Sequence, residues 1–241
     1  MNILLIGYGK MGKAIEQIAL QRNHQIIGKI NQNNRKDLPN FTPAQIDVAI
    51  EFTQPEAVVE NLITCFQNNI PVVCGTTGWL SQKNLVENLC QTYKGSFLYA
   101  SNFSIGVNLF FRLNIFLAQL MSSFKQYDVS LEEIHHTEKK DAPSGTAITL
   151  AENILQYYPH KTKWVNAPSE ELSELSIISR REANVPGTHV VSYRSTVDSI
   201  EIKHTAHNRM GFALGAVLAA EWLQGKQGIF TMQDVLKNIS F

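Results

Sequence analysis

The chain begins with MNILLIGYGKMG at residues 1–12, where an apolar run leads directly into three glycines spaced G-x-G-x-x-G. The run predicts a buried strand and the residues after it a helix. In this turn Gly7 permits a tight bend, Gly9 lets a ligand approach the backbone, and Gly12 lets the helix pack closely. Free amides at the helix start then face a pyrophosphate. We predict a dinucleotide site with contacts from Gly7, Tyr8, Gly9, Lys10, Met11 and Gly12.

The first hundred residues alternate short apolar runs with helix-like stretches, which is typical of a parallel, doubly wound sheet covered on both faces. Thr53-Gln54-Pro55-Glu56 predicts a helix start, because it combines a capping box with an early proline. Ser81 is expected to cap the next helix. The predicted strands are Ile3–Ile6, Gln25–Ile30, Val48–Phe52, Pro71–Cys74 and Phe97–Ala100.

After residue 106 the pattern changes to one of a more open, largely antiparallel sheet. The polar stretch Pro159–Glu174 is expected to be a surface loop or a partner-facing arm. Helices are expected at about Val107–Ser123, Ser144–Tyr157 and Gly211–Leu223, and strands at Tyr127–Ile134, Leu175–Ser179, His189–Tyr193 and Ile200–His204.

These patterns predict an α/β fold with two domains. A Rossmann-type doubly wound parallel sheet is joined to a second, α+β domain with an open mixed or antiparallel sheet. We expect residues 1–106 and 209–241 to form the dinucleotide-binding domain. Residues 107–208 are expected to bind substrate and form an oligomer, since an open sheet leaves a face and edges to cover.

The composition excludes several classes of protein. Lys plus Arg and Asp plus Glu both number 21, so the net charge attracts neither nucleic acid nor an anionic membrane. The first residues lack the basic region of a secretory signal, and a cytoplasmic protein is expected. The three cysteines lack the spacing of a disulfide framework or a zinc site, and no metal is expected.

The expected ribose-binding position, about 20 residues after the glycines, carries Asn31 or Gln32 in place of the acid that selects NAD. Without that acid, a 2′-phosphate is not repelled. Lys10, Lys29, Arg35 and Lys36 lie near enough in sequence to attract it, although each is also explained as a solvated surface cation. The pattern favours NADPH and leaves NADH open.

Two segments follow predicted strands at the carboxyl edge of the sheet, where parallel sheets bind ligands. They are Cys74–Gly78 and Ala100–Gly106, and both are rich in glycine and small polar residues. Such residues let the backbone approach a flat nicotinamide ring. With the end of the third strand, these segments give Phe52, Thr53, Thr76 and Asn102 as candidate cofactor contacts.

Residues 133–147, EIHHTEKKDAPSGTA, place two imidazoles and two ammonium groups just before a predicted helix start. Asp141 or Ser144 is expected to cap that helix. The amides of Gly145 and Thr146 would then face an incoming carboxylate. The stretch predicts an anion site beside proton donors.

This stretch resembles the hallmark E-x-H-H-x-x-K-x-D-A-P-S-G-T-A of the 4-hydroxy-tetrahydrodipicolinate reductases, without a gap. The glycine-rich segments occur in the order of that family, and likeness extends to residues 180–189 and 204–215. Val185–His189 follows the family pattern only loosely and is given no role.

The resemblance implies a two-domain enzyme of lysine and diaminopimelate biosynthesis that reduces a small cyclic dicarboxylic imine with NADPH or NADH. It implies His135 as the general acid and Lys139 as the cation that assists protonation. His136, Ser144, Gly145 and Thr146 are implied as substrate contacts, and a homotetramer as the assembly. The resemblance also implies cofactor contacts from Gly75, Thr77, Ser101 and Phe103, because the corresponding family segments line the nicotinamide. Histidine suits the task, since hydride addition leaves electron density that an acid near neutrality must protonate.

Two other functions remain open. One is a dehydrogenase of another small carboxylated substrate, and the other is a non-catalytic sensor that binds a dinucleotide. A sensor has no use for His135 and Lys139. The enzyme hypothesis requires that the bound nicotinamide and the double-histidine loop face a common crevice.

Overall fold

The computed structural model describes residues 1–237, which form two compact units. Of the described residues, unit 1 comprises 1–105 and 209–237, and unit 2 comprises Gly106–Asn208. Within the described range, no helix combines the length and apolar character needed to cross a membrane.

Unit 1 is built on a six-stranded sheet in the order β11-β5-β4-β3-β1-β2. Every neighbouring pair is parallel, which confirms the Rossmann-type doubly wound architecture. The strands are β1 (Asn2–Ile6), β2 (Gln25–Ile30), β3 (Val48–Glu51), β4 (Val72–Cys74), β5 (Ser96–Tyr99) and β11 (Gly228–Phe230). The helices are α1 (Lys10–Gln21), α2 (Pro55–Gln67), α3 (Lys83–Thr92), α6 (Met210–Leu223) and α7 (Met232–Leu236), with 3-10 turns η1 (Arg35–Asn40) and η2 (Leu80–Gln82).

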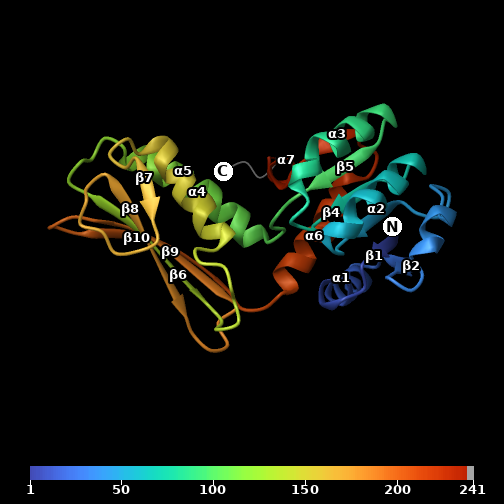
Figure 1. Ribbon diagram of the computed structural model, residues 1–241, viewed down its shortest axis with the longest axis horizontal. Helices are drawn as coiled ribbons and strands as arrows, with labels where there is room; N and C mark the ends of the chain where they lie inside the picture. The colour runs from blue at the N-terminus through green and yellow to red at the C-terminus, as the bar shows by residue number, and fades with distance from the viewer. Residues whose placement is uncertain (238–241) are drawn as a thin grey trace. The chain divides into compact units, whose positions relative to one another are not determined.

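The sheet of unit 1 has an apolar core on each face. One core joins it to α2 and α3 through residues such as Leu62 and Val86, and the other joins it to α1 and α6 through Ile15 and Ala216 (Figure 1). We expected the strands to be buried on both faces of the sheet. This is confirmed for β1, β3 and β4 but is wrong for β2, in which exposed and less exposed residues alternate. The reason is position, since β2 is an edge strand.

Helix α6 brings the chain back to unit 1 and packs very closely against the segment that follows β5. A Cβ added to Gly215 would lie 1.7 Å from the carbonyl oxygen of Phe103, so only glycine lets α6 lie against the segment after β5. The helix that we predicted at Gly211–Leu223 is confirmed, beginning one residue earlier.

Unit 2 carries a five-stranded sheet in the order β10-β9-β6-β8-β7. Helices α4 (Ile105–Met121) and α5 (Gly145–Tyr157) pack on one of its faces (Figure 1). Its strands are β6 (Asp128–His135), β7 (Lys163–Val165), β8 (Glu174–Arg181), β9 (Gly187–Arg194) and β10 (Ser199–Ala206).

The sheet of unit 2 is evenly mixed. The β10–β9 and β9–β6 pairs are antiparallel, whereas β6–β8 and β8–β7 are parallel. A mixed sheet is confirmed, but the expectation of a largely antiparallel one is wrong for half of the pairs. Helix α5 connects β6 to β7 and β8 as a crossover, and such a connection makes the joined strands parallel.

Two local predictions are wrong, and a third is right only in part. Helix α2 begins with Pro55 at its first turn as predicted, but its N-cap is Gln54, and the Thr53 hydroxyl donates to buried Glu51 instead of capping. Ser81 does not cap α3, because the turn η2 occupies residues 80–82 and the helix begins only at Lys83. The stretch Pro159–Glu174 is a surface loop in large part, as predicted, but it also contains strand β7 and a Lys161 side chain that is only 3% exposed.

Candidate active site

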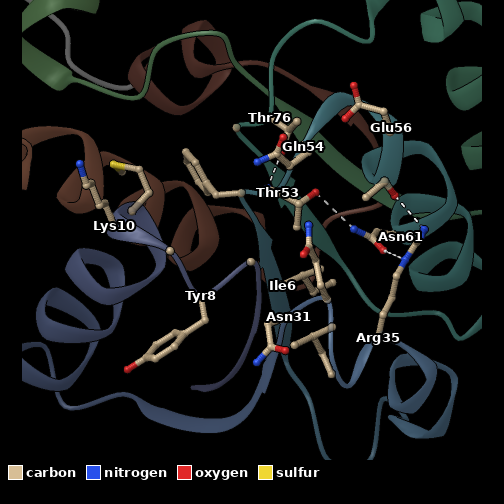
Figure 2. Close-up of a pocket in the computed structure, with 18 of the residues that line it drawn as sticks. Ile6, Tyr8, Lys10, Asn31, Arg35, Thr53, Gln54, Glu56, Asn61 and Thr76 are labelled. Carbon is tan, nitrogen blue, oxygen red and sulfur yellow. Dashed lines mark hydrogen bonds between the residues drawn. The ribbon is translucent and has the colours of Figure 1, made fainter.

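A cleft of about 820 Å³ opens at the carboxyl edge of the unit 1 sheet (Figure 2). Tyr8 and Lys10 lie on one side of it, and Arg35 and Asn61 lie on the other. Ten predicted cofactor contacts belong to its lining, namely Gly7, Tyr8, Gly9, Lys10, Met11, Phe52, Thr53, Gly75, Thr76 and Thr77.

The first two glycines of the fingerprint differ in what surrounds them. Gly7 has φ +95°, and a Cβ there would lie 1.9 Å from the Phe52 carbonyl oxygen. A Cβ on Gly9 would meet no protein atom within 4 Å. The fold therefore requires Gly7, whereas Gly9 leaves a bare backbone surface that suits a pyrophosphate at the start of α1.

Four predicted contacts lie outside the cleft lining. Gly12 packs α1 against the turn, because a Cβ there would lie 2.2 Å from the Gly7 carbonyl oxygen. Phe103 is 2% exposed, and its ring centroid lies 5.6 Å from that of Phe52, which does line the cleft. The other two are Ser101 and Asn102, and the Asn102 amide oxygen accepts the Ser104 backbone N–H at 2.9 Å.

A buried carboxylate, Glu51, lies beneath this cleft and is absent from the sequence predictions. It accepts the Thr76 hydroxyl at 2.6 Å, the Asn61 amide at 3.3 Å and the Thr53 hydroxyl, and all three donors line the cleft. Burial raises the pKa of Glu51 above its ordinary value, while these hydrogen bonds oppose the shift. Glu51 therefore fixes the orientation of the cleft's polar side chains.

Two of the cations that we predicted to attract a 2′-phosphate, Lys29 and Arg35, form ion pairs with glutamates. Lys29 lies 2.7 Å from a Glu16 carboxylate oxygen and 4.6 Å from the centroid of the Tyr8 ring. Arg35 lies 2.7 Å from Glu60 and also donates to the Asn61 side chain at 3.2 Å. Both Arg35 and Asn31 line the cleft where β2 ends.

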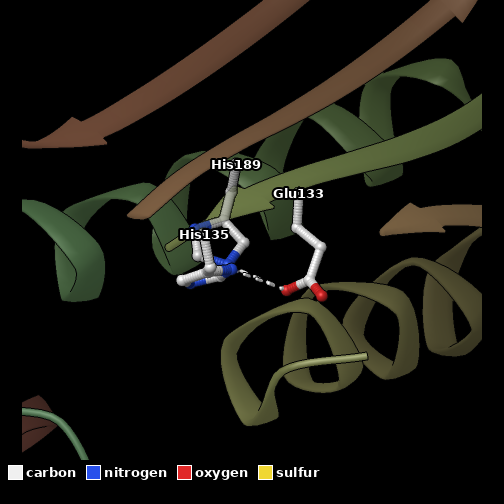
Figure 3. Close-up of side chains that lie close together, drawn as sticks. All are labelled: Glu133, His135 and His189. Carbon is white, nitrogen blue, oxygen red and sulfur yellow. Dashed lines mark ion pairs between the residues drawn. The ribbon is translucent and has the colours of Figure 1, made fainter. Parts of the chain in front are cut away.

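In unit 2, three side chains come together at the end of β6: Glu133, His135 and His189 (Figure 3). The Glu133 Oε2 atom lies 3.3 Å from His135 Nδ1 and 3.7 Å from His189 Nε2. The two imidazole rings are 5.0 Å apart at 72°. All three residues are more than nine-tenths buried.

The registers of the sheet create this cluster. Glu133 pairs with His189 across the β6–β9 ladder, and His135 pairs with Arg181 across the β6–β8 ladder. Strand β6 ends at His135, as expected if both histidines reach a common ligand, and the neighbouring His136 is half-buried.

The N-terminus of α5 is fixed by the same cluster. Ser144 caps the helix by accepting the Ala147 N–H at 3.2 Å, which confirms one of the two caps that we predicted. The Ser144 N–H donates to both oxygens of Glu133 at 3.1 Å, and its hydroxyl lies 3.1 Å from His189 Nε2. Helix geometry leaves the amides of Gly145 and Thr146 without an intrahelical acceptor.

The loop between His136 and Ser144 is held by charged groups. Lys139 binds both oxygens of Asp141 at 2.8 and 2.9 Å. Arg181 donates to the carbonyl oxygens of Lys139 at 3.3 Å and Asp141 at 2.6 Å, and it also lies 3.5 Å from Glu133. Arg181 therefore connects the loop to the buried cluster.

The cluster contains one charged and one neutral member. Burial disfavours ionisation of Glu133, but hydrogen bonds from His135 and Ser144 outweigh it and hold the pKa of that carboxyl well below its usual range. Burial, and after it the charge of His135, lowers the pKa of His189 to about 4. Near neutral pH Glu133 is therefore an anion and His189 an uncharged imidazole.

The donor atoms of Glu133, His135 and His189 all lie within 4.8 Å of one another, and two imidazoles with a carboxylate form a ligand set that zinc and iron accept. Here, however, Glu133 already accepts two hydrogen bonds from Ser144 and faces the Arg181 cation. The arrangement is better suited to holding an imidazole than to binding a dication.

The sequence did not indicate the roles of Glu133, Arg181, His189 or Glu51. Glu133 was quoted only as part of the motif, and Val185–His189 was left without a role. Burial alternates along β6, so Glu133 and His135, which are two residues apart, lie on the same face of the strand. This relation could have been predicted from the sequence. Nothing local indicates that His189 is the cross-strand partner of Glu133.

Comparison with known families finds two matches that together cover nearly all of the chain. The model described as "Dihydrodipicolinate reductase, N-terminus" matches residues 1–103, and "Dihydrodipicolinate reductase, C-terminus" matches residues 106–236.

Curated relatives agree along the full length. The 4-hydroxy-tetrahydrodipicolinate reductase of Christiangramia forsetii is 51% identical over 240 residues, covering 99% of each chain. That of Rickettsia rickettsii is 39% identical over 251 aligned positions, covering 98% of this chain and 99% of the relative. Among solved structures, a dipicolinate-bound dihydrodipicolinate reductase from Paenisporosarcina sp. TG-14 has the same fold, with a TM-score of 0.75, 23% identity and coverage of 100% and 99%.

Proposed function

The chain belongs to the dihydrodipicolinate reductase family, and on this premise we propose that it reduces 4-hydroxy-tetrahydrodipicolinate to tetrahydrodipicolinate with NAD(P)H. It is an oxidoreductase of lysine and diaminopimelate biosynthesis. The observation that carries the proposal is the loop from His135 to Thr146, which places an imidazole, an ammonium group and an open helix start together.

We assign cofactor binding to unit 1. The Gly7–Met11 turn and the Thr53 and Thr76 side chains would hold the dinucleotide, because the uncovered backbone at Gly9 fits a pyrophosphate. When bound, the nicotinamide supplies the hydride. Phe103 supports the Phe52 ring from behind, so its effect on the cofactor is through Phe52.

We assign substrate binding and proton transfer to unit 2. Reduction adds a hydride and a proton to the substrate and releases one water, and His135 donates that proton. Lys139 offsets negative charge near a doubly carboxylated substrate. Lys139 is paired with Asp141, whose side chain is 58% exposed, so a substrate carboxylate would replace a weak, solvated partner.

The start of α5 would bind a second carboxylate of the substrate. The amides of Gly145 and Thr146 provide donors at the positive end of the helix dipole. His136 and the Ser144 hydroxyl complete the contacts that the family motif implies. The Ser144 N–H is already bound to Glu133, so only its side chain remains for substrate.

NADPH is the cofactor that we propose to be preferred. Asn31, Gln32 and Asn33 follow β2 where an acid would select an unphosphorylated ribose, and Lys10 and Arg35 line the same cleft. The Arg35–Glu60 pair is exposed at 36% and 78%, and such pairs are weak enough to yield to a phosphate.

A homotetramer in the cytoplasm is the state that we propose for the enzyme. The face of the unit 2 sheet opposite α4 and α5 presents half-buried Ile134, Ile178 and Val190, which suits a contact between copies. The cysteines are free thiols, as is usual in a reducing compartment.

A steady-state assay with NADPH and with NADH tests the function, using substrate generated in situ from pyruvate and aspartate semialdehyde. We expect turnover with both and a higher kcat/KM with NADPH. His135→Ala should bind NADPH nearly normally but lower kcat by about 100-fold or more, as for loss of a general acid. Unchanged turnover in this variant would favour a different acid, and no turnover in the parent would favour the sensor.

A further inference from the structure

We propose that Glu133 and His189 are positioning residues of the reductase, which together fix the His135 imidazole and the Ser144 hydroxyl toward the substrate. The inference rests on the proposed function and extends it to two residues for which no role has been given. Neither side chain needs to touch substrate, because Glu133 contacts the His135 ring and the Ser144 N–H, and His189 contacts the Ser144 hydroxyl.

Glu133 has no exposed surface and is surrounded by two imidazoles, a backbone N–H and a guanidinium. Its Oε2 atom lies 3.3 Å from His135 Nδ1, and both oxygens accept the Ser144 N–H at 3.1 Å. Arg181 lies 3.5 Å from Oε1. The Glu133 carboxylate therefore holds both the His135 imidazole, which is the proposed proton donor, and the start of α5, which would bind a substrate carboxylate. These contacts fix the positions of the two groups relative to each other.

The partner of Nδ1 determines which nitrogen of His135 reacts. An anion beside Nδ1 keeps a proton there, so that Nε2 is the atom that gives its proton away. Nε2 lies next to Gly187, where an added Cβ would be only 3.1 Å from it. Gly187 thus keeps a side chain away from Nε2, which assigns a role to one residue of the segment Val185–His189.

His189 acts on Ser144. Its Nε2 lies 3.1 Å from the Ser144 hydroxyl and 3.7 Å from the Glu133 anion, which attracts an N–H and repels a lone pair. Nε2 therefore carries the proton and donates to Ser144. Since Ser144 also accepts the Ala147 N–H, its own hydroxyl proton remains available for a substrate carboxylate.

The experiment compares Glu133→Gln with Glu132→Gln in the same assay. Glu132 is the neighbouring residue on the opposite face of β6, paired with Arg180 at 2.6 Å, and serves as the matched control. In E133Q we expect kcat to fall about 100-fold, on the scale of losing an orienting carboxylate, with KM changed less than about 3-fold. The amide oxygen of Gln still accepts the Ser144 N–H, so the helix start is preserved.

The pH profile separates positioning from a merely structural role. The cluster of Glu133, His135 and His189 has further charged or titratable groups around it, namely Arg181 on β8, Lys139 and Asp141 in the loop, and His204, which pairs with His189 from β10. Only Glu133 changes in E133Q. The fall of kcat with rising pH should therefore begin at lower pH in E133Q, and not in E132Q.

A spectroscopic measurement on the unaltered protein tests the inference without any variant. With ¹⁵N-labelled histidine, neutral His135 should carry its proton on Nδ1, and His189 should stay neutral with its proton on Nε2 from pH 8 down to about pH 5. Neutral His135 protonated on Nε2, or an E133Q enzyme with the parent's kcat and pH profile, would overturn the proposal. A parent protein without turnover would refute the proposed function alone, since the tautomers are read independently.

Discussion

At the scale of single residues, backbone geometry explains the glycines in the turn after β1, whereas electrostatics explains the side chains in the cluster at the end of β6. Gly7 is required by the backbone, whereas Gly9 is surrounded by open space. In the cluster, an ionised carboxylate and a neutral imidazole share one buried site. Each cause predicts a different outcome of substitution.

Gly9→Ala should fold normally and bind cofactor poorly. Its new methyl meets no protein atom within 4 Å but covers the amides that would face the pyrophosphate. We expect a free energy of unfolding within about 0.5 kcal/mol of the parent and an NADPH Kd raised about 10-fold or more. Gly7→Ala, the contrast, should lose about 3 kcal/mol through the clash with Phe52 and the positive φ. Equal stability of the two variants would contradict this assignment.

The low pKa of His189 should make stability depend on pH. Its folded-state value is about 4 against 6.5 in the unfolded chain, so between these values the unfolded state binds more protons. The contribution is complete above pH 6.5 and is lost as the pH falls toward 4, at up to about 1.4 kcal/mol per pH unit. When the free energy of unfolding is measured in urea from pH 5 to 6.5, it should rise less steeply with pH in His189→Gln than in the parent protein. The difference in slope should correspond to about one proton. Parallel slopes would mean that His189 is protonated in the folded protein.

The sequence predicted some of the site and not the rest. The loop from His135 to Thr146 is contiguous, so its chemistry can be read locally. Glu133, Arg181 and His189 meet only because of the register of β6 with β8 and β9, and register depends on the whole sheet. Glu51 was missed because an acid at a strand end gives no sign that Thr53, Asn61 and Thr76 will surround it.

At the scale of helices and strands, periodicity was a better guide than capping rules. The strand and helix positions were largely predicted, because long apolar runs leave few alternatives. The caps expected at Thr53 and Ser81 are wrong, since a buried carboxylate and a 3-10 turn compete for those residues. β7 was missed because only three residues pair there, in a polar stretch.

Helix α6 gives a prediction at this scale. In Gly215→Ala the new methyl would lie 1.7 Å from the Phe103 carbonyl, so α6 must move away from the segment after β5. We expect a loss of about 3 kcal/mol in urea unfolding of unit 1, followed by Trp79 and Trp222 fluorescence. Gly211→Ala in the same helix, where the nearest atom is 3.9 Å away, should lose nothing. A stable Gly215→Ala protein would show that the approach of α6 is not tight.

At the scale of the whole molecule, the uncovered face of the unit 2 sheet should determine assembly. Ile178 lies on this face beside Glu132, whereas Val197 is an apolar residue in a turn, 88% exposed. Ile178→Asp should shift the protein to a smaller species in sedimentation velocity, because an unpaired charge would be buried between copies. Val197→Asp should not. An unchanged mass for Ile178→Asp would exclude this face as the contact.

The position of β11 beside β5 has a consequence for synthesis on the ribosome. The sixth strand of the first sheet lies at residues 228–230, after all of unit 2 has been translated. Unit 2 has its full complement of strands once residue 206 has emerged, while unit 1 still lacks α6 and an edge strand. The later-encoded unit should thus be the first to become protease-resistant in nascent chains, which reverses the usual order in which domains mature during translation.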